Sequence, residues 1–150
     1  MLFRSMIAGG LPTRVYYASL GGFDTHAGQL NSHERLMATL NDAVAALVAD
    51  LKHQGNFDRV LLMTFSEFGR RVSENANAGT DHGAAAPMFL IGGGVKPGLI
   101  GKHPSLSDLD NGDLKFGTDF RSVYASVLEQ WLRAPSQLVL GRKFAMLPIV

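Results

Sequence analysis

A long amphipathic segment between two short apolar runs constrains the fold of this chain more than any other feature. Residues 31–55 carry leucine and valine at helical spacing, which predicts one long helix. Residues 13–20 and 59–66, on either side of it, are rich in β-branched, aromatic and other apolar residues and predict buried strands. A strand, a crossover helix and a second strand form a βαβ unit, so we expect these two strands to run parallel in one sheet.

Sequence signals also mark the two ends of the long helix. Asn31 is followed three residues later by Glu34, as in a capping box. Gly55 stands where a glycine commonly ends a helix. The pattern therefore predicts where this helix begins and ends.

The rest of the chain predicts one further strand and one further helix. Residues 87–94 are apolar and end in glycines, which favours a third short strand. Residues 118–132 repeat apolar side chains at helical spacing, and residues 133–150 predict an irregular tail packed on the body. Residues 1–12 resemble the end of a helix that began earlier in a longer chain. We expect a single α/β domain over residues 1–150.

Composition narrows the classes of partner. The 150 residues include 14 basic and 13 acidic residues and no cysteine, for a net charge of +1. No basic stripe is present to neutralise phosphates, so we expect no nucleic-acid partner. Without cysteine, disulfides and thiolate metal sites are excluded. No apolar run approaches the ~20 residues of a membrane span. The oligomeric state cannot be read from the sequence.

Three polar, glycine-containing loops lie at or near the ends of the predicted strands. Their sequences are "GGFDTH" (21–26), "SEFGRR" (66–71) and "NAGTDHG" (77–83). Because sites in open parallel sheets form at the carboxyl ends of strands, we expect these loops to converge. They supply carboxylates and imidazoles suited to Zn, Mn or Fe, namely Asp24, His26, Glu67, Asp81 and His82. Arg70 or Arg71 would bind an anionic oxygen of a substrate.

Structural roles compete with these functional ones. Asp24 also fits an Asx-turn, and Glu67 also fits a helix cap or an ion pair with Arg70. Asp81 is as well suited to orient His82 through a hydrogen bond as it is to bind a metal. His26 also fits an ordinary surface loop residue, so the residues alone leave these alternatives open.

Five segments of the sequence match a known family in order. The chain resembles the C-terminal part of the larger bacterial family called domain of unknown function 1501. The resemblance rests on the segments "GGFDTH", "SEFGRR", "GTDHG", "FLIGGGVKPGLIG" and "TDFRSVYASVLEQWL". That family is grouped with alkaline phosphatases and sulfatases, which implies a three-layer α/β/α fold with a parallel sheet, of which these residues form a part. The resemblance also implies an exported or periplasmic protein.

The same resemblance implies site residues. Asp24, His26 and His82 resemble ligands of one divalent metal, with Asp81 beside His82 as a further ligand. Glu67 takes the place of an Asp-His pair. Phe68 follows it where a histidine would hold a second metal, which argues against that second site.

Three functions follow from these observations. The first is a metal-dependent hydrolase of small anionic phosphate or sulfate esters, in which Glu67 is a ligand or base and Arg70 contacts the substrate. Its nucleophile would lie in an N-terminal part, so residues 1–150 are expected to be inactive alone. The second is a non-catalytic exported protein, with a binding or secretion-associated role, that kept the fold. The third is a purely structural hydrogen-bond network between the two Asp-His loops.

Overall fold

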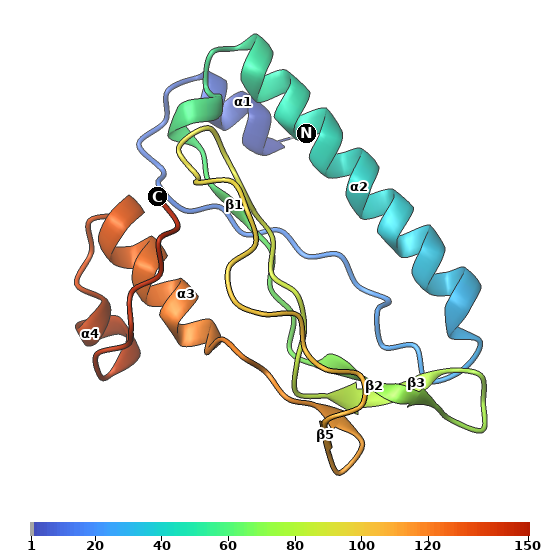
Figure 1. The fold of residues 1–150 in the computed structure, drawn as a ribbon. Coiled ribbons are helices and arrows are strands. Elements are labelled where there is room, and N and C mark those ends of the chain that lie inside the picture. Colours follow the sequence, from blue (N-terminus) through green and yellow to red (C-terminus); the bar gives the residue numbers. More distant parts are fainter. Residues whose placement is uncertain (1) are drawn as a thin grey trace.

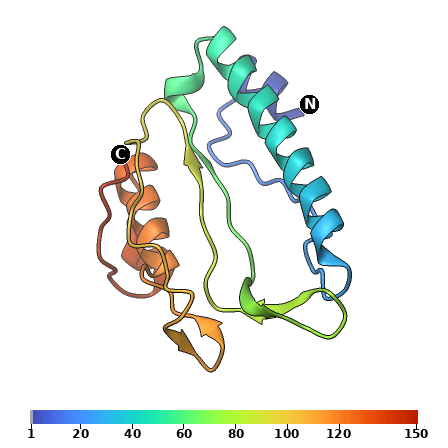
Figure 2. The same ribbon diagram turned by 45° about the vertical axis from the view of Figure 1, so that its right-hand side comes forward.

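The structure, a computed structural model, describes residues 2–150 and is dominated by one long helix (Figure 1). The helices are α1 (Leu2–Ala8), α2 (Gln29–His53), α3 (Phe120–Ser126) and α4 (Ser136–Leu140), with a 3-10 turn η1 (Phe57–Arg59) and a π-helical segment η2 (Val127–Trp131). The strands are β1 (Leu62–Met63), β2 (Gly69–Glu74), β3 (Thr80–Gly83), β4 (Leu90–Ile91), β5 (Leu109–Asp110) and β6 (Asp113–Leu114). Figure 1 and Figure 2 both show α2 on one side of the extended segments and α3 with α4 on the other. No helix among residues 2–150 is both long enough and apolar enough to cross a membrane.

The expected three-layer fold with a parallel sheet is wrong. The described strands form three separate antiparallel pairs, β1 with β4, β2 with β3 and β5 with β6. Even the longest strand, β2, has only six residues. Among the residues that the structure describes, no two strands run parallel, so the predicted βαβ unit does not form.

The first predicted strand, residues 13–20, is not part of any sheet. No backbone hydrogen bond joins it to the rest of the described chain. Val15 and Tyr17 are each 68% exposed. Its β-branched and aromatic residues favour an extended backbone, but a strand also needs a partner that pairs with its N–H and C=O groups.

The second and third predicted strands are present in shortened form. β1 and β4 pair two residues each, with Leu62 opposite Ile91. The pairing continues through a backbone hydrogen bond from Thr64 N to Phe89 O of 2.9 Å. Both runs are apolar, as expected, but they run antiparallel.

The long helix is confirmed, although it begins differently from the prediction. Helix α2 starts at Gln29, after Gly28 in the left-handed conformation, so Asn31 lies inside the helix and does not cap it. Backbone carbonyls from the β2–β3 turn take the place of a side-chain cap. Gly28 N donates to Asn77 O at 3.0 Å and Gln29 N donates to Ala78 O at 2.8 Å. These bonds satisfy donors that a helix start otherwise leaves free.

The end of α2 agrees with the prediction. Gly55 has a φ of 69°, and Asn56 N donates to Leu51 O at 2.8 Å. A glycine in this conformation closes the helix by bonding its last carbonyls.

The second predicted helix is also confirmed, as α3 continued by η2. It begins at Asp119, whose carboxylate accepts a hydrogen bond from Arg121 N. Hydrogen bonds from Arg121 lower the pKa of Asp119 to about 2. The tail packs on this helix as expected, because Leu147 N donates to Ser126 Oγ at 2.8 Å and Ile149 is 1% exposed. Part of the tail, which was expected to be irregular, forms α4.

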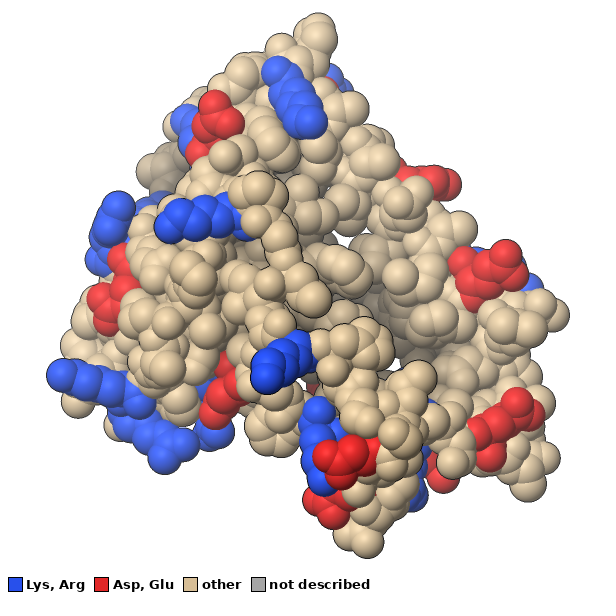
Figure 3. Space-filling view, viewed as in Figure 1, with Lys and Arg blue, Asp and Glu red and all other residues tan. Residues whose placement is uncertain are grey.

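Charges are mixed on the face seen in Figure 3, where basic and acidic side chains alternate. This face shows no broad area of a single sign. The distribution agrees with the near-balance of basic and acidic residues in the sequence.

Candidate metal centre

Three side chains from two distant segments meet at one point. Asp24 and His26 lie in the loop that leads into α2, and His82 lies in β3. Asp24 Oδ1 is 2.9 Å from His26 Nε2 and 2.8 Å from His82 Nε2, and the two nitrogens are 3.0 Å apart. We call these three residues the triad. They are the group of histidine and carboxylate residues with metal-ligand spacing in the described chain.

The carboxylate of the triad is in its charged form. The hydrogen bond from His82 is the main influence that lowers the pKa of Asp24 below its ordinary value. His26 and Arg70, whose guanidinium is 3.9 Å from Asp24 Oδ1, lower it further through their charge. An ionised carboxylate is the form that binds a metal.

Hydrogen bonding alone does not satisfy the triad. If both Nε2 atoms carry protons, both donate to Asp24, and two donor nitrogens are then held 3.0 Å apart with no acceptor between them. If one Nε2 is unprotonated, its lone pair faces the ionised oxygen of Asp24 at less than 3 Å. A cation bound by all three atoms removes both conflicts, because each atom then directs a lone pair at it.

The spacing leaves room on one side of such a cation. Metal–ligand bonds of about 2.0–2.2 Å are longer than the distance from the centre of this small triangle to its corners, so the three atoms would not enclose an ion completely. The side chains of Asp24, His26 and His82 are 63%, 46% and 44% exposed. The triad would therefore supply three ligands to an ion and leave it accessible to water or substrate.

Asp81 lies directly behind His26. Its Oδ1 is 3.4 Å from His26 Nδ1, on the far side of the ring from the triad. Asn75 Nδ2 donates to Asp81 Oδ1 at 3.2 Å, and this bond is the main influence that lowers the pKa of Asp81. A carboxylate on one ring nitrogen holds the proton there and leaves the other nitrogen free for a metal. Asp81, expected as a ligand or as a partner of His82, thus contacts His26 and lies outside the triad.

Asn75, which the sequence analysis did not select, organises this region. Its side chain donates to His26 O at 3.1 Å and accepts from the backbone N–H groups of Asn77 and Gly79. Gly79 lies so close to His26 that a Cβ atom there would be 2.3 Å from the His26 carbonyl carbon. The detectable signal is the "NANAG" stretch (75–79), because asparagine and glycine together are typical of tight turns.

Two predicted catalytic residues take other positions. Arg70 donates hydrogen bonds to the backbone carbonyls of Phe23 and Thr80, so its guanidinium is engaged by the protein itself. Glu67 is exposed and makes no hydrogen bond or ion pair with the described residues. Neither residue belongs to the triad.

Phe68 packs against His82. The sequence resemblance placed Phe68 where a histidine would hold a second metal. Its ring stacks on the imidazole of His82, with centroids 3.6 Å apart and planes 6° from parallel. The stack restricts the His82 ring to one plane. The sequence signal was the position of Phe68, two residues after the end of the apolar run 59–66.

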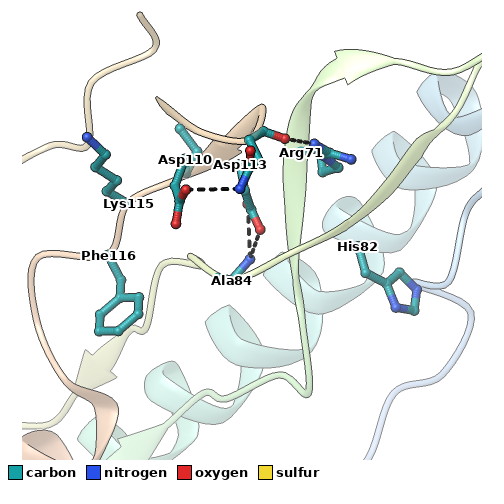
Figure 4. Close-up of a pocket in the computed structure, with 9 residues that line it drawn as sticks. Arg71, His82, Ala84, Asp110, Asp113, Lys115 and Phe116 are labelled. Atoms are coloured by element: carbon teal, nitrogen blue, oxygen red, sulfur yellow. Dashed lines mark hydrogen bonds between the residues drawn. The ribbon is translucent and has the colours of Figure 1, made fainter. Parts of the chain in front are cut away.

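The opposite side of the β2–β3 hairpin carries a separate pocket of about 480 Å³. Arg71 donates to Asn111 O there, and both carboxylate oxygens of Asp113 accept from Ala84 N (Figure 4). His82 also lines this pocket, but its ring points away from Asp113 in Figure 4. Arg70 and Arg71 therefore form their hydrogen bonds on opposite faces of one hairpin.

Comparison with known proteins decides the family. The family described as "Protein of unknown function (DUF1501)" matches residues 3–141. The chain belongs to this family. Comparison with curated proteins gives no match, and comparison with solved structures gives none either.

For this DUF1501 protein, the matched range includes the whole triad and the turn behind it. The resemblance to domain of unknown function 1501 is confirmed. No match supports the wider grouping with alkaline phosphatases and sulfatases, and the antiparallel strand pairs do not support the fold of that grouping.

Proposed function

We propose that the triad of Asp24, His26 and His82 holds a divalent metal and that the protein is a metal-dependent hydrolase of phosphate or sulfate esters. The observation that carries the proposal is the mutual approach of three ligand atoms within 3.0 Å. With Asp24 ionised, each placement of protons on the two ring nitrogens leaves at least one of the three contacts without its own hydrogen bond. The ester substrate rests only on the resemblance to alkaline phosphatases and sulfatases, whereas the metal rests on the geometry of the triad.

The protein's own residues would prepare the centre for this chemistry. A bound metal supplies a Lewis acid and makes a coordinated water acidic. Asp24 stays ionised beside two imidazoles and an arginine. Asp81 holds the proton of His26 on Nδ1, and Phe68 fixes the plane of the His82 ring. The exposure of all three ligand side chains gives an ester access from solvent.

The test measures hydrolysis by the full-length gene product that contains this chain. The metal-loaded protein is assayed with p-nitrophenyl phosphate and p-nitrophenyl sulfate, beside His82→Ala and His103→Ala. His103 is exposed and bonds only Pro104 O, so it is the matched control. We expect His82→Ala to lower kcat/KM at least ~100-fold, because metal charge stabilisation contributes several kcal/mol to such reactions. No hydrolysis of either ester by the metal-loaded protein would contradict the proposed activity.

A second candidate is a non-catalytic, exported metal-binding protein with a binding or secretion-associated role. Two positions favour it. Among the described residues, Glu67 makes no hydrogen bond or ion pair with the triad, and Arg70 is bound to backbone carbonyls. This candidate predicts stoichiometric metal without turnover in the same experiment.

A further inference from the structure

Arg70 joins the two segments that carry the triad. It lies opposite His82 in the β2–β3 pairing, and its side chain is 18% exposed. Its guanidinium donates to the backbone oxygens of Phe23 and Thr80 and lies 3.4 Å from Thr25 Oγ1.

The acceptors of Arg70 are placed on both sides of the triad. Phe23 and Thr25 are the two neighbours of Asp24 in the chain. Thr80 stands two residues before His82 in β3. A single planar group thus connects the loop of Asp24 and His26 to the strand of His82. The rigid fork of an arginine can serve two such acceptors at fixed geometry, whereas a lysine ammonium is a compact point charge.

The hydrogen bonds of the Arg70 guanidinium within the protein leave little of it free to bind a substrate. One terminal nitrogen donates to Thr80 and the other donates to Phe23. The Phe68 ring lies 5.0 Å from its central carbon and shields the group. The charge acts on Asp24, 3.9 Å away.

We infer that Arg70 is a positioning residue that sets the distance between Asp24 and His82 and so controls metal affinity. It is not a ligand of the substrate. The inference rests on the metal centre of the proposed function but not on ester hydrolysis, so it stands if the protein binds metal without turnover.

Arg71 provides a matched control in the neighbouring position. It has the same side chain and lies in the same strand, but it faces the other side of the hairpin and donates to Asn111 O. An arginine-to-lysine replacement keeps the positive charge at either position, but at position 71 it leaves the triad's connections intact.

The experiment measures Zn²⁺ affinity by competition with a chromophoric chelator, and the absorption spectrum of bound Co²⁺, in the full-length gene product. We expect Arg70→Lys to weaken Zn²⁺ binding about 10–100-fold, the range found for residues that orient ligands, and to alter the Co²⁺ spectrum. Arg71→Lys should leave both unchanged. Excess metal should restore the occupancy of Arg70→Lys, as a positioning role requires.

Two results would overturn the inference. One is wild-type Zn²⁺ affinity and Co²⁺ spectrum in Arg70→Lys, and the other is an equal loss in Arg71→Lys. Circular dichroism checks the fold of each variant. If Arg70→Lys does not fold, Arg70→Gln replaces it, since the shorter side chain keeps donors but reaches only one of the two segments. If the wild-type protein binds no Zn²⁺, the metal centre and this inference fall together.

Discussion

The two nitrogens of His26 face different partners, and this division defines the candidate centre. Nε2 lies 2.9 Å from Asp24 Oδ1, and Nδ1 lies 3.4 Å from Asp81 Oδ1. If Nε2 binds a metal, the carboxylate at Nδ1 would hold the remaining ring proton. Asp81 therefore influences a bound metal through His26.

Replacing Asp81 tests this influence at the scale of one residue. We expect Asp81→Asn to weaken Zn²⁺ binding about 10–100-fold, because a neutral amide holds the His26 proton less firmly than an ionised carboxylate. The chelator competition titration measures the change. Asp108→Asn is the control, since Asp108 is exposed and pairs with Lys115 away from the triad. Equal affinities of Asp81→Asn and the wild-type protein would show that Asp81 does not orient His26.

Residue types and their local setting were enough to select the members of the triad. Asp24, His26 and His82 stood out as imidazoles and a carboxylate in glycine-flanked loops, and the structure brings them together. The sequence did not show in which direction each side chain would point. Arg70 and Arg71 are neighbours in sequence, yet alternation along a strand sends them to opposite faces. For the same reason no pattern revealed that Glu67 would stay apart from the triad.

The β2–β3 hairpin is the element that builds the centre, and the sequence did not predict it. The segments 66–71 and 77–83 were expected to be polar loops, because they lack the alternation of apolar and polar residues that is typical of a strand. The pairing is irregular, with a register shift between Arg70 and Glu74. Contacts with the start of α2 hold the hairpin, and such contacts are not visible in a local pattern.

Gly79 tests how tightly this hairpin must approach the loop of His26. A Cβ atom at position 79 would lie 2.3 Å from the His26 carbonyl carbon, which is backbone and has to move. We expect Gly79→Ala to weaken Zn²⁺ binding by at least ~10-fold, as loss of ligand orientation does. The melting temperature should also fall.

Gly117→Ala is the matched control for that substitution. Nothing lies within 4 Å of a Cβ atom at Gly117, and its φ is not positive. Replacement should therefore leave metal binding unchanged and stabilise the fold by about 0.4–1 kcal/mol, through the lower entropy of the unfolded chain. Unchanged metal binding and melting temperature in Gly79→Ala would contradict the close approach.

For the whole molecule, α2 and the helix formed by α3 and η2 were predictable, whereas the strand pairing was not. The apolar residues of segments 31–55 and 118–132 recur with the period of a helix, and this pattern depends only on residues within one element. Both helices are confirmed. A strand depends on partners elsewhere in the chain. The apolar runs 13–20, 59–66 and 87–94 showed extended character but not which segments pair or in which direction.

The triad converges by a route that differs from the expected one. The prediction placed its residues at the carboxyl edge of a parallel sheet. In the structure the β2–β3 hairpin folds back onto the start of α2 and brings His82 to Asp24. The chemistry of the loops therefore selected the three residues of the triad, together with Asp81 and Glu67, which lie outside it, and the topology that was meant to bring them together was wrong.

The metal content of the purified full-length gene product tests the central claim most directly. Elemental mass spectrometry would be run on the wild-type protein, His82→Ala and the control His103→Ala. A filled triad predicts about one Zn, Mn or Fe ion per chain in the wild-type protein and in His103→Ala, and almost none in His82→Ala. Absence of metal from the wild-type protein after incubation with each ion, or equal content in His82→Ala, would contradict the claim that the triad is a metal centre.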